Sequence, residues 1–352
     1  MKTRVFVVLS FLVILSMVFP ASVYAAAPKA DVDCSKADTF CVGLVTDVGK
    51  IDDKSFNQSA YEGLKQAEKE LGVTTKYIET TDSKDYGKNI ETFAEAGYKV
   101  IITVGFALGE ATIEEAKKYP DIKFIGVDQS QTEVLDNLSG IVFAEDQSGY
   151  LAGVLAGLMT KTNKVGGVFA TDTVPPVWRF GEGYRAGIKS VNDKAEINIV
   201  YHNDVGLDKT FADPEWGKTT ANSMMDKGVD VIFSAGGKTG NGGLIAVAGK
   251  STKEKPIYAI GVDTDQYLTV PEAQKVLLSS AMKSITPAVF DNIKAAKEGK
   301  FKGGNFYGPV SLAPFHDLDS VVSKEVKAKL EEVNKGLLDG TIKTNVPATK
   351  PG

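Results

Sequence analysis

The chain alternates between short apolar runs and helical patterns, and this alternation limits its fold more than any other feature. In residues 55–71, Phe56, Ala60 and Leu64 recur at spacings of three and four, as on one face of a helix. Strand, helix and strand in alternation predict a parallel sheet with helices on both faces. The apolar runs of the first series are FCVGLV (40–45), TKYIE (75–79), KVIITVG (99–105), KFIGV (123–127) and GIVFA (140–144).

A second series follows and echoes the first. The stretch VIITVGFALGEATIEEA leads to KFIGVDQ, and VIFSAGGKTGNGGLIAVA leads to IYAIGVDTDQ. Asp128 and Asp263 therefore each follow an IGV run, at the carboxyl end of an expected strand. Parallel sheets bind ligands at these ends, so two facing sheets predict a cleft lined from both sides. The strands expected in this series are 164–170, 197–202, 229–237 and 257–263, separated by helical patterns near 148–161, 181–191, 215–227 and 241–249.

Composition fits an α/β protein of about two domains. The chain has 352 residues, of which 43% are hydrophobic, enough for a sizeable core. Its formal net charge is -5, whereas a nucleic-acid binder needs a basic face to neutralise phosphates. We therefore expect no nucleic-acid partner.

The first residues have the pattern of an export signal. Lys2 and Arg4 precede the apolar run VFVVLSFLVILSMVF, and SVYAAA offers small residues for cleavage. We expect residues 1–27 to be a signal peptide, with a retained anchor as the alternative. No Leu-x-x-Cys lipobox is visible, because DVD precedes Cys34, so the sequence does not support a lipid anchor. Export would permit a disulfide between Cys34 and Cys41, with two free thiols as the alternative.

The stretch DVGKIDDKSFNQSAYEG (47–63) places several acceptors around one aromatic ring. Asp47 ends the first strand, while Asp53, Phe56 and Asn57 occupy the loop and the first helical turn. A structural role is open, since Asp53 or Ser55 would cap the helix and Ser55 with Gln58 has capping-box spacing. An aromatic ring beside carboxylates also suits a flat polar heterocycle that carries hydroxyl groups.

Three further stretches are candidates for ligand contact. Trp178 and Phe180 lie in PPVWRFGEGYRAG (175–187), which we expect to be a Pro-Gly loop opening a helix. Either ring could face Phe56 from the second half, or pin the loop to its lobe. Gly236, in the glycine-rich SAGGKTGNGG, suits close approach of the backbone to a ligand. Lys283 is a candidate donor or an ordinary surface lysine.

Signatures of catalysis and of cofactor binding are sparse. The chain has two histidines, and we find no Gly-x-Ser-x-Gly elbow, His-Glu-x-x-His motif or clustered metal ligands. The glycine-rich stretch lacks the spacing of a Walker A loop. The aspartates could act as paired acid and base, but binding a diol or a base also needs carboxylates. We expect a binding protein without a cofactor or metal.

Several stretches together resemble the basic membrane protein family, the substrate-binding proteins of ATP-driven importers typified by purine nucleoside receptors. They are VGLVTDVGKIDDKSFNQSAYEGL, VPPVWRFGEGYRAG, GVDTDQ and SLAPFHDLDS, in the family's order, and the resemblance covers roughly residues 39–344. It implies an α/β fold of the two-lobed type I periplasmic binding protein class. Each lobe would be a parallel sheet flanked by helices, with the ligand cleft between the lobes.

The resemblance also implies boundaries. The first lobe would comprise residues 39–145 with about 264–300, and the second 146–263 with about 301–350. The chain would then cross between the lobes three times and form a three-stranded hinge.

The same resemblance assigns roles to residues. A phenylalanine in the loop before the first helix stacks on the base in nucleoside-binding members, which matches Phe56. A second ring, Trp178 or Phe180, would face it, and Gly236, Asp263 and Lys283 would contact the ribose. The ligand-binding positions implied in all are Asp47, Asp53, Phe56, Asn57, Asp128, Trp178, Phe180, Gly236, Asp263 and Lys283.

Taken together, the sequence patterns and the family resemblance imply an exported, monomeric, non-enzymatic binding protein, periplasmic or extracellular and held at the membrane through a permease. By the same resemblance it would bind a nucleoside, with a purine nucleoside expected, and pass it to the ABC permease subunits. A sugar or signalling molecule as ligand, or a nucleoside-processing enzyme, remain the alternatives.

Overall fold

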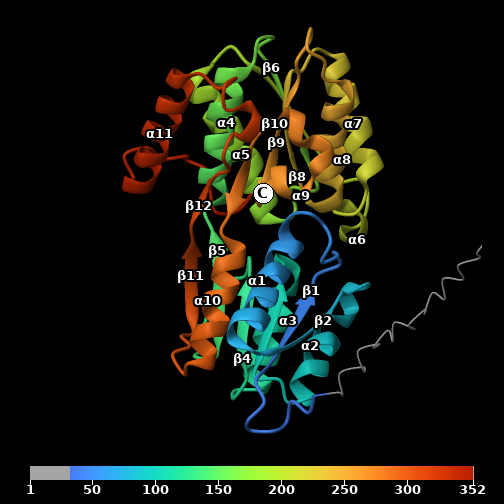
Figure 1. The fold of residues 1–352 in the computed structure, drawn as a ribbon, viewed down its shortest axis with the longest axis vertical. Coiled ribbons are helices and arrows are strands. Elements are labelled where there is room, and N and C mark those ends of the chain that lie inside the picture. Colours follow the sequence, from blue (N-terminus) through green and yellow to red (C-terminus); the bar gives the residue numbers. More distant parts are fainter. Residues whose placement is uncertain (1–31, 352) are drawn as a thin grey trace, which may run out of the picture. The chain divides into compact units, whose positions relative to one another are not determined.

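The computed structural model describes residues 32–351, and residues from Asp33 onward form one compact unit. The expected signal peptide, residues 1–27, lies outside the described residues. Two lobes make up this unit, each built on a six-stranded sheet (Figure 1). Within residues 32–351, no helix combines the length and apolar character needed to span a membrane.

The sheet of the first lobe is parallel throughout, in the order β11-β5-β4-β3-β1-β2. Helices α1 and α10 pack on one face through Leu64 and Val289, and α2 and α3 cover the other through Ile90 and Ala116. The predicted alternation is therefore present. The elements are β1 (Cys41–Thr46), α1 (Phe56–Leu71), β2 (Thr74–Ile78), α2 (Tyr86–Glu95), β3 (Val100–Val104), α3 (Gly109–Lys118), β4 (Lys123–Val127), β5 (Leu138–Phe143), α10 (Ile285–Lys297) and β11 (Gly304–Gly308).

The sheet of the second lobe has the order β12-β10-β9-β8-β6-β7, and only β12 runs antiparallel to its neighbour. Helices α4, α5 and α11 cover one face, and α7 and α8 the other. The elements are α4 (Glu145–Met159), β6 (Lys164–Phe169), α5 (Pro175–Val191), β7 (Glu196–Tyr201), α6 (Leu207–Thr210), α7 (Pro214–Asp226), β8 (Val231–Ala235), α8 (Gly237–Lys250), β9 (Tyr258–Asp263), α9 (Gln266–Thr269), β10 (Leu277–Lys283), β12 (Val310–Leu312) and α11 (Lys324–Asp339).

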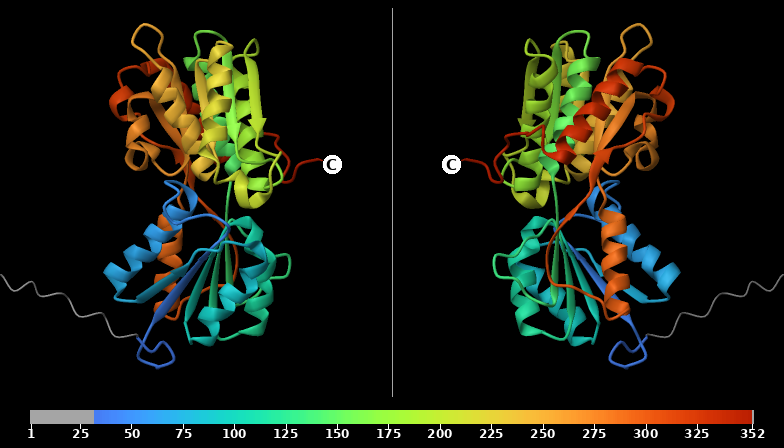
Figure 2. Two further views of the ribbon diagram at one scale, coloured as in Figure 1. Left: turned by 90° about the vertical axis from the view of Figure 1, so that its right-hand side faces the viewer. Right: turned by 90° about the vertical axis from the view of Figure 1, so that its left-hand side faces the viewer.

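The chain crosses between the lobes after β5, after β10 and after β11, as the side views show (Figure 2). The last two crossings differ from the predicted boundaries near residues 264 and 301. Strand β10 pairs with β9 and so still belongs to the second sheet, while β11 pairs with β5 and belongs to the first. A strand tends to pair with its predecessor after a short crossover, and this keeps β10 beside β9.

The segment before β1 is tied down by a disulfide between Cys34 and Cys41, whose Cα atoms lie 5.6 Å apart. Cys41 is the first residue of β1 and is fully buried, and Cys34 is 5% exposed. The bridge therefore fixes the start of the described chain to the first sheet. Four short 3₁₀ helices complete the described elements, at Ser83–Asp85, Phe106–Leu108, Pro271–Val276 and His316–Leu318.

Candidate functional site

A cavity of about 290 Å³ lies between the two lobes. Its polar lining comes largely from strand ends: Asp47 and Asp128 follow β1 and β4, and Asp263 and Lys283 end β9 and β10. In parallel sheets these ends converge at one edge, so the two sheets bring their polar residues together. A ligand in this cavity would contact both lobes.

All of the predicted site residues except Trp178 line this cavity. Trp178 instead lines a different pocket, together with Thr344 and Pro347 of the C-terminal segment. We expected a loop here, but Pro175 begins α5, in the first turn where proline is well tolerated. Residues two apart on a helix face different directions, so Phe180 reaches the cavity and Trp178 does not. The predicted residues in the lining are Asp47, Asp53, Phe56, Asn57, Asp128, Phe180, Gly236, Asp263 and Lys283.

Asp53 caps helix α1. Its carboxylate accepts hydrogen bonds from the backbone N–H groups of Ser55, Asn57 and Gln58, at 2.9–3.0 Å. The Ser55 side chain makes no capping bond, contrary to the capping-box spacing, and donates instead to Asp263 of the second lobe at 2.6 Å. Asp53 therefore has the helix-capping role that the sequence left open. The same loop also forms a hydrogen bond to the second lobe through Ser55.

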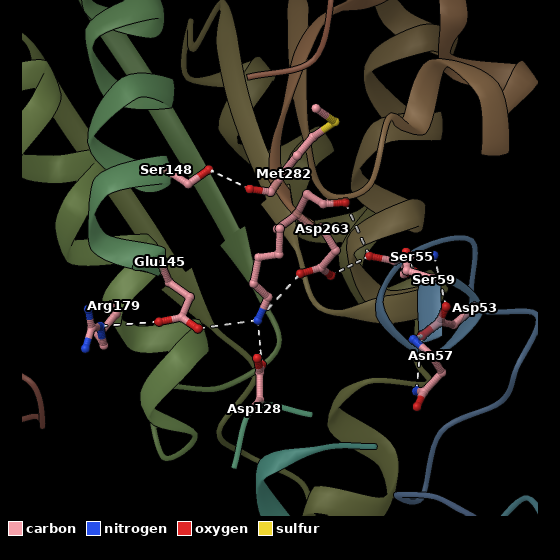
Figure 3. A network of polar contacts seen from close by, with 12 residues as sticks. Asp53, Ser55, Asn57, Ser59, Asp128, Glu145, Ser148, Arg179, Asp263 and Met282 are labelled. Atoms are coloured by element: carbon pink, nitrogen blue, oxygen red, sulfur yellow. Dashed lines mark hydrogen bonds and ion pairs between the residues drawn. The ribbon is translucent and has the colours of Figure 1, made fainter. Parts of the chain in front are cut away.

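Lys283 lies at the centre of a buried charge cluster. Its ammonium is 2.5 Å from Asp128 Oδ2, 3.5 Å from Glu145 Oε1 and 3.9 Å from Asp263 Oδ1. Its side chain is 2% exposed, so it is not an ordinary surface lysine. Three carboxylates therefore surround one cation, and two of them, Asp128 and Glu145, accept hydrogen bonds from it. The carboxylates of this cluster, Asp128, Glu145 and Asp263, are labelled in Figure 3.

Aromatic rings surround the same ammonium. The ring centres of Phe56, Phe143 and Phe180 lie 4.9, 5.3 and 5.5 Å from Lys283 Nζ. Ring faces attract a cation, and this attraction adds to the ion pairs in a dry environment. Arg179 extends the cluster outward, because it pairs with Glu145 at 3.4 Å and also with Asp146.

Burial sets the protonation of these groups. It raises the pKa of Asp47 to about 7, aided by the charge of Asp53, and that of Glu145 also to about 7. It raises the pKa of Asp263 to about 6, although Lys283 and Ser55 act in the opposite direction. Burial alone would lower the pKa of Lys283, but the carboxylates around it raise it. The cavity therefore holds an ammonium that stays charged and carboxyl groups that change charge near neutrality.

The two lobes have the same backbone conformation at the strand ends that line the site. Asp128 and Asp263 have φ values of 58° and 64°, in the left-handed region that non-glycine residues seldom adopt. Gly105 and Gly236, at the neighbouring strand ends, have φ values of 117° and 118°. The sequence echo of the two halves thus corresponds to matching turns. Such unfavourable backbone conformations are concentrated at functional sites.

Sequence reasoning missed several residues of this region, four of which are aromatic or charged groups of particular interest. Phe211 and Phe106 line the cavity, and Glu145 and Arg179 complete the charge cluster. Glu145 begins α4 directly after a buried strand, a signal that could have been used. Phe211 follows a four-residue helix in an irregular segment, and no periodicity marks it. In residues 32–351 no group of acidic, histidine or cysteine side chains is arranged to hold a metal ion.

Two facing α/β lobes with a polar cavity at their strand ends define a ligand-binding protein of the two-lobed periplasmic class, as predicted. The solute-binding protein of an ABC transporter system from Aeropyrum pernix K1 has this fold. It matches with a TM-score of 0.78 and 26% identity, over 86% of this chain and 92% of that protein.

The family model described as ABC transporter substrate-binding protein PnrA-like matches residues 40–338, and the chain belongs to this family, Bmp. The family resemblance found in the sequence is therefore confirmed. A Listeria innocua protein named CD4+ T-cell-stimulating antigen is 37% identical, over 97% of this chain and 99% of its own length. The ABC transporter nucleoside-binding protein BmpA of Lactococcus lactis is 35% identical, over 85% of this chain and 87% of its own length. This is a family of substrate-binding proteins of ABC transporters.

Proposed function

We propose that the chain binds a purine nucleoside in the interlobe cavity and delivers it to the permease of an ABC importer. It would do so as a monomer, outside the cytoplasmic membrane, without catalysing a reaction. The family and the nucleoside-binding relative from Lactococcus lactis support this proposal.

The observation that carries the proposal is a pair of half-buried rings, one from each lobe, on the same cavity. Phe56 comes from the first lobe and Phe211 from the second. Phe180 also lines the cavity, but it is 2% exposed and packs on Phe233 and Lys283. We therefore assign the second stacking ring to Phe211. Stacking of a base on aromatic rings contributes about 1–3 kcal/mol per base.

Carboxylates would accept hydrogen bonds from the polar edges of the nucleoside. Asp47 is the more accessible of them, and in its charged form it can accept hydrogen bonds from N–H groups of the base. Asp263 and Gly236, which line the cavity, would contact the ribose, and Lys283 would hold the carboxylates in place. A ligand without a ribose hydroxyl would leave a buried acceptor unpaired, which is costly.

Calorimetric titration of residues 28–352, refolded from denaturant to remove any carried-over ligand, tests the proposal. The panel comprises adenosine, guanosine, inosine, uridine, free bases, ribose and hexoses. Tight binding of purine nucleosides is expected, with no product after prolonged incubation. Binding of a hexose alone would refute the nucleoside assignment and leave the transport class. Release of a free base from a bound nucleoside would point to an enzyme.

A further inference from the structure

The loop Asp52–Ser55 of the first lobe is seated on the second lobe, next to α8 and α9 (Figure 1). The backbone carbonyl of Lys54 accepts hydrogen bonds from Gln266 Nε2 at 3.2 Å and from Thr269 Oγ1 at 2.7 Å. The carbonyl of Asp53 accepts one from Asn241 Nδ2 at 2.8 Å. Consecutive carbonyls of one lobe are thus satisfied by side chains of the other.

Side chains of the loop add two more links between the lobes. Ser55 Oγ donates to Asp263 Oδ2 at 2.6 Å (Figure 3), and Asp52 pairs with Lys238 at 2.9 Å. The Asp52–Lys238 pair is solvent-exposed, so we expect little stabilisation from it. Lys54 has a φ of 62°, an unfavourable conformation for a residue with a side chain. Such a conformation persists only where surrounding contacts hold it.

The donors on the second lobe are prearranged. Gln266 is 1% exposed; its Oε1 accepts from Val262 N at 2.9 Å, and its Nε2 also donates to Asn241 Oδ1 at 2.9 Å. A glutamine also follows the strand-end aspartate of the first lobe: Gln129 is next to Asp128, whereas Gln266 is three residues after Asp263. The Gln129 amide donates to the carbonyls of Thr103 and Gly105 in its own lobe. Of these two glutamines, only Gln266 bonds across to the other lobe.

We propose that Asn241, Gln266 and Thr269 are positioning residues for ligand binding. They hold the loop Asp52–Ser55, and with it Asp53 and Phe56, against the second lobe when the lobes are closed. None of the three lines the cavity, so they act through the loop rather than on the ligand. The identity of the ligand, a purine nucleoside, rests on the function proposed above.

This role has a consequence that a direct contact would not have. Hydrogen bonds between the lobes exist only in the closed form, so their loss shifts the closing equilibrium. Every ligand that requires closure then loses affinity by the same factor. A residue that touches the base or the sugar would instead discriminate among ligands.

Thr269→Val tests the proposal, with Thr286→Val as a matched control. Both threonines donate to a backbone carbonyl at 2.7 Å, but Thr286 bonds to Ser59 within the first lobe. For Thr269→Val we expect affinity about fivefold weaker for each nucleoside that binds, mainly through faster dissociation. Thr286→Val should leave affinity unchanged. Equal effects of the two substitutions, no effect of Thr269→Val, or a loss that differs between bases would overturn the proposal.

Hydrogen exchange of the ligand-free protein gives a second readout that needs no ligand. Peptides covering residues 50–56 should exchange faster in Thr269→Val than in the parent and in Thr286→Val. If no compound of the panel binds, the proposed function fails, and this exchange comparison alone decides the positioning role. Unchanged exchange in Thr269→Val would refute it.

Discussion

The ring of Phe56 contacts both the hydrophobic core and the cavity. Its ring packs against the apolar core of the first lobe and also lines the cavity. Phe56→Ala should weaken nucleoside binding by about 5- to 150-fold, the equivalent of about 1–3 kcal/mol of stacking. Phe290→Ala is the matched control, because Phe290 packs on the same core cluster without lining the cavity. Calorimetric titration measures both; equal affinity losses would mean that Phe56 only supports the fold.

Asp47 should make the stability of the protein depend on pH. Its pKa is 3.8 in the unfolded chain and about 7 in the folded protein, so the folded form binds the extra proton between these values. The free energy of unfolding should therefore fall as pH rises from about 4 to 7. Asp47→Asn removes this contribution, so the fall between pH 5 and pH 8, measured by urea unfolding, should be smaller. An unchanged pH dependence would contradict the raised pKa.

Site residues could be predicted from the sequence where the position of a residue at the end of a strand is enough to bring its side chain to the site. Asp47, Asp128 and Asp263 follow from the rule that parallel strands end at a ligand-binding edge. Trp178 was misplaced because the direction of a ring depends on where its helix begins. Phe211 and Arg179 could not be found, since their places depend on packing between segments distant in sequence.

Helices α4 and α5 are packed closely by glycines on both sides. A Cβ added to Gly153 would lie 2.1 Å from the carbonyl oxygen of Tyr184, and one added to Gly187 2.0 Å from that of Tyr150. Glycine therefore lets the two backbones touch, and this holds α5 where Phe180 reaches the cavity. The glycines in GYLAGVLAGL and GEGYRAG serve this packing.

Gly153→Ala should force α4 and α5 apart. We expect it to lower the free energy of unfolding by about 1–3 kcal/mol, as overpacking does. Gly249→Ala is the control, since an added Cβ on Gly249 of α8 meets nothing within 4 Å. There the substitution should stabilise by about 0.5–1 kcal/mol. Urea unfolding of both variants measures the difference, and a Gly153→Ala protein as stable as the parent would argue against close backbone packing.

At the scale of the whole molecule, the alternating pattern was enough to predict two α/β lobes. Local periodicity identifies a strand but not the strands that it pairs with. The positions where the chain passes from one lobe to the other were therefore predicted less accurately. The run from Leu277 to Lys283 looks the same in either sheet, and only its pairing with β9 assigns it to the second. The cluster around Lys283 is therefore a property of the complete fold, since β4, α4, β9 and β10 must all be in place.

Lys283 connects the two lobes electrostatically, because Asp128 belongs to the first and Asp263 and Glu145 belong to the second. Lys283→Met would leave these carboxyl groups together without their cation. Removing one member of a buried ion pair costs about 3–5 kcal/mol. The carboxyl groups can take up protons instead, and the raised pKa values of Glu145, about 7, and Asp263, about 6, show that they do so readily.

The loss of stability in Lys283→Met should therefore be larger at pH 8 than at pH 5, because at the lower pH the carboxyl groups become neutral and no longer need the ammonium. Urea unfolding of the parent and of Lys283→Met at the two pH values measures this loss of stability. Lys300→Met is the control, since Lys300 pairs with Glu298 at the surface and its side chain is 74% exposed. Its effect should stay within about 0.5 kcal/mol at both pH values. Equal losses for Lys283→Met at pH 5 and pH 8 would mean that the ammonium holds the lobes by packing rather than by charge.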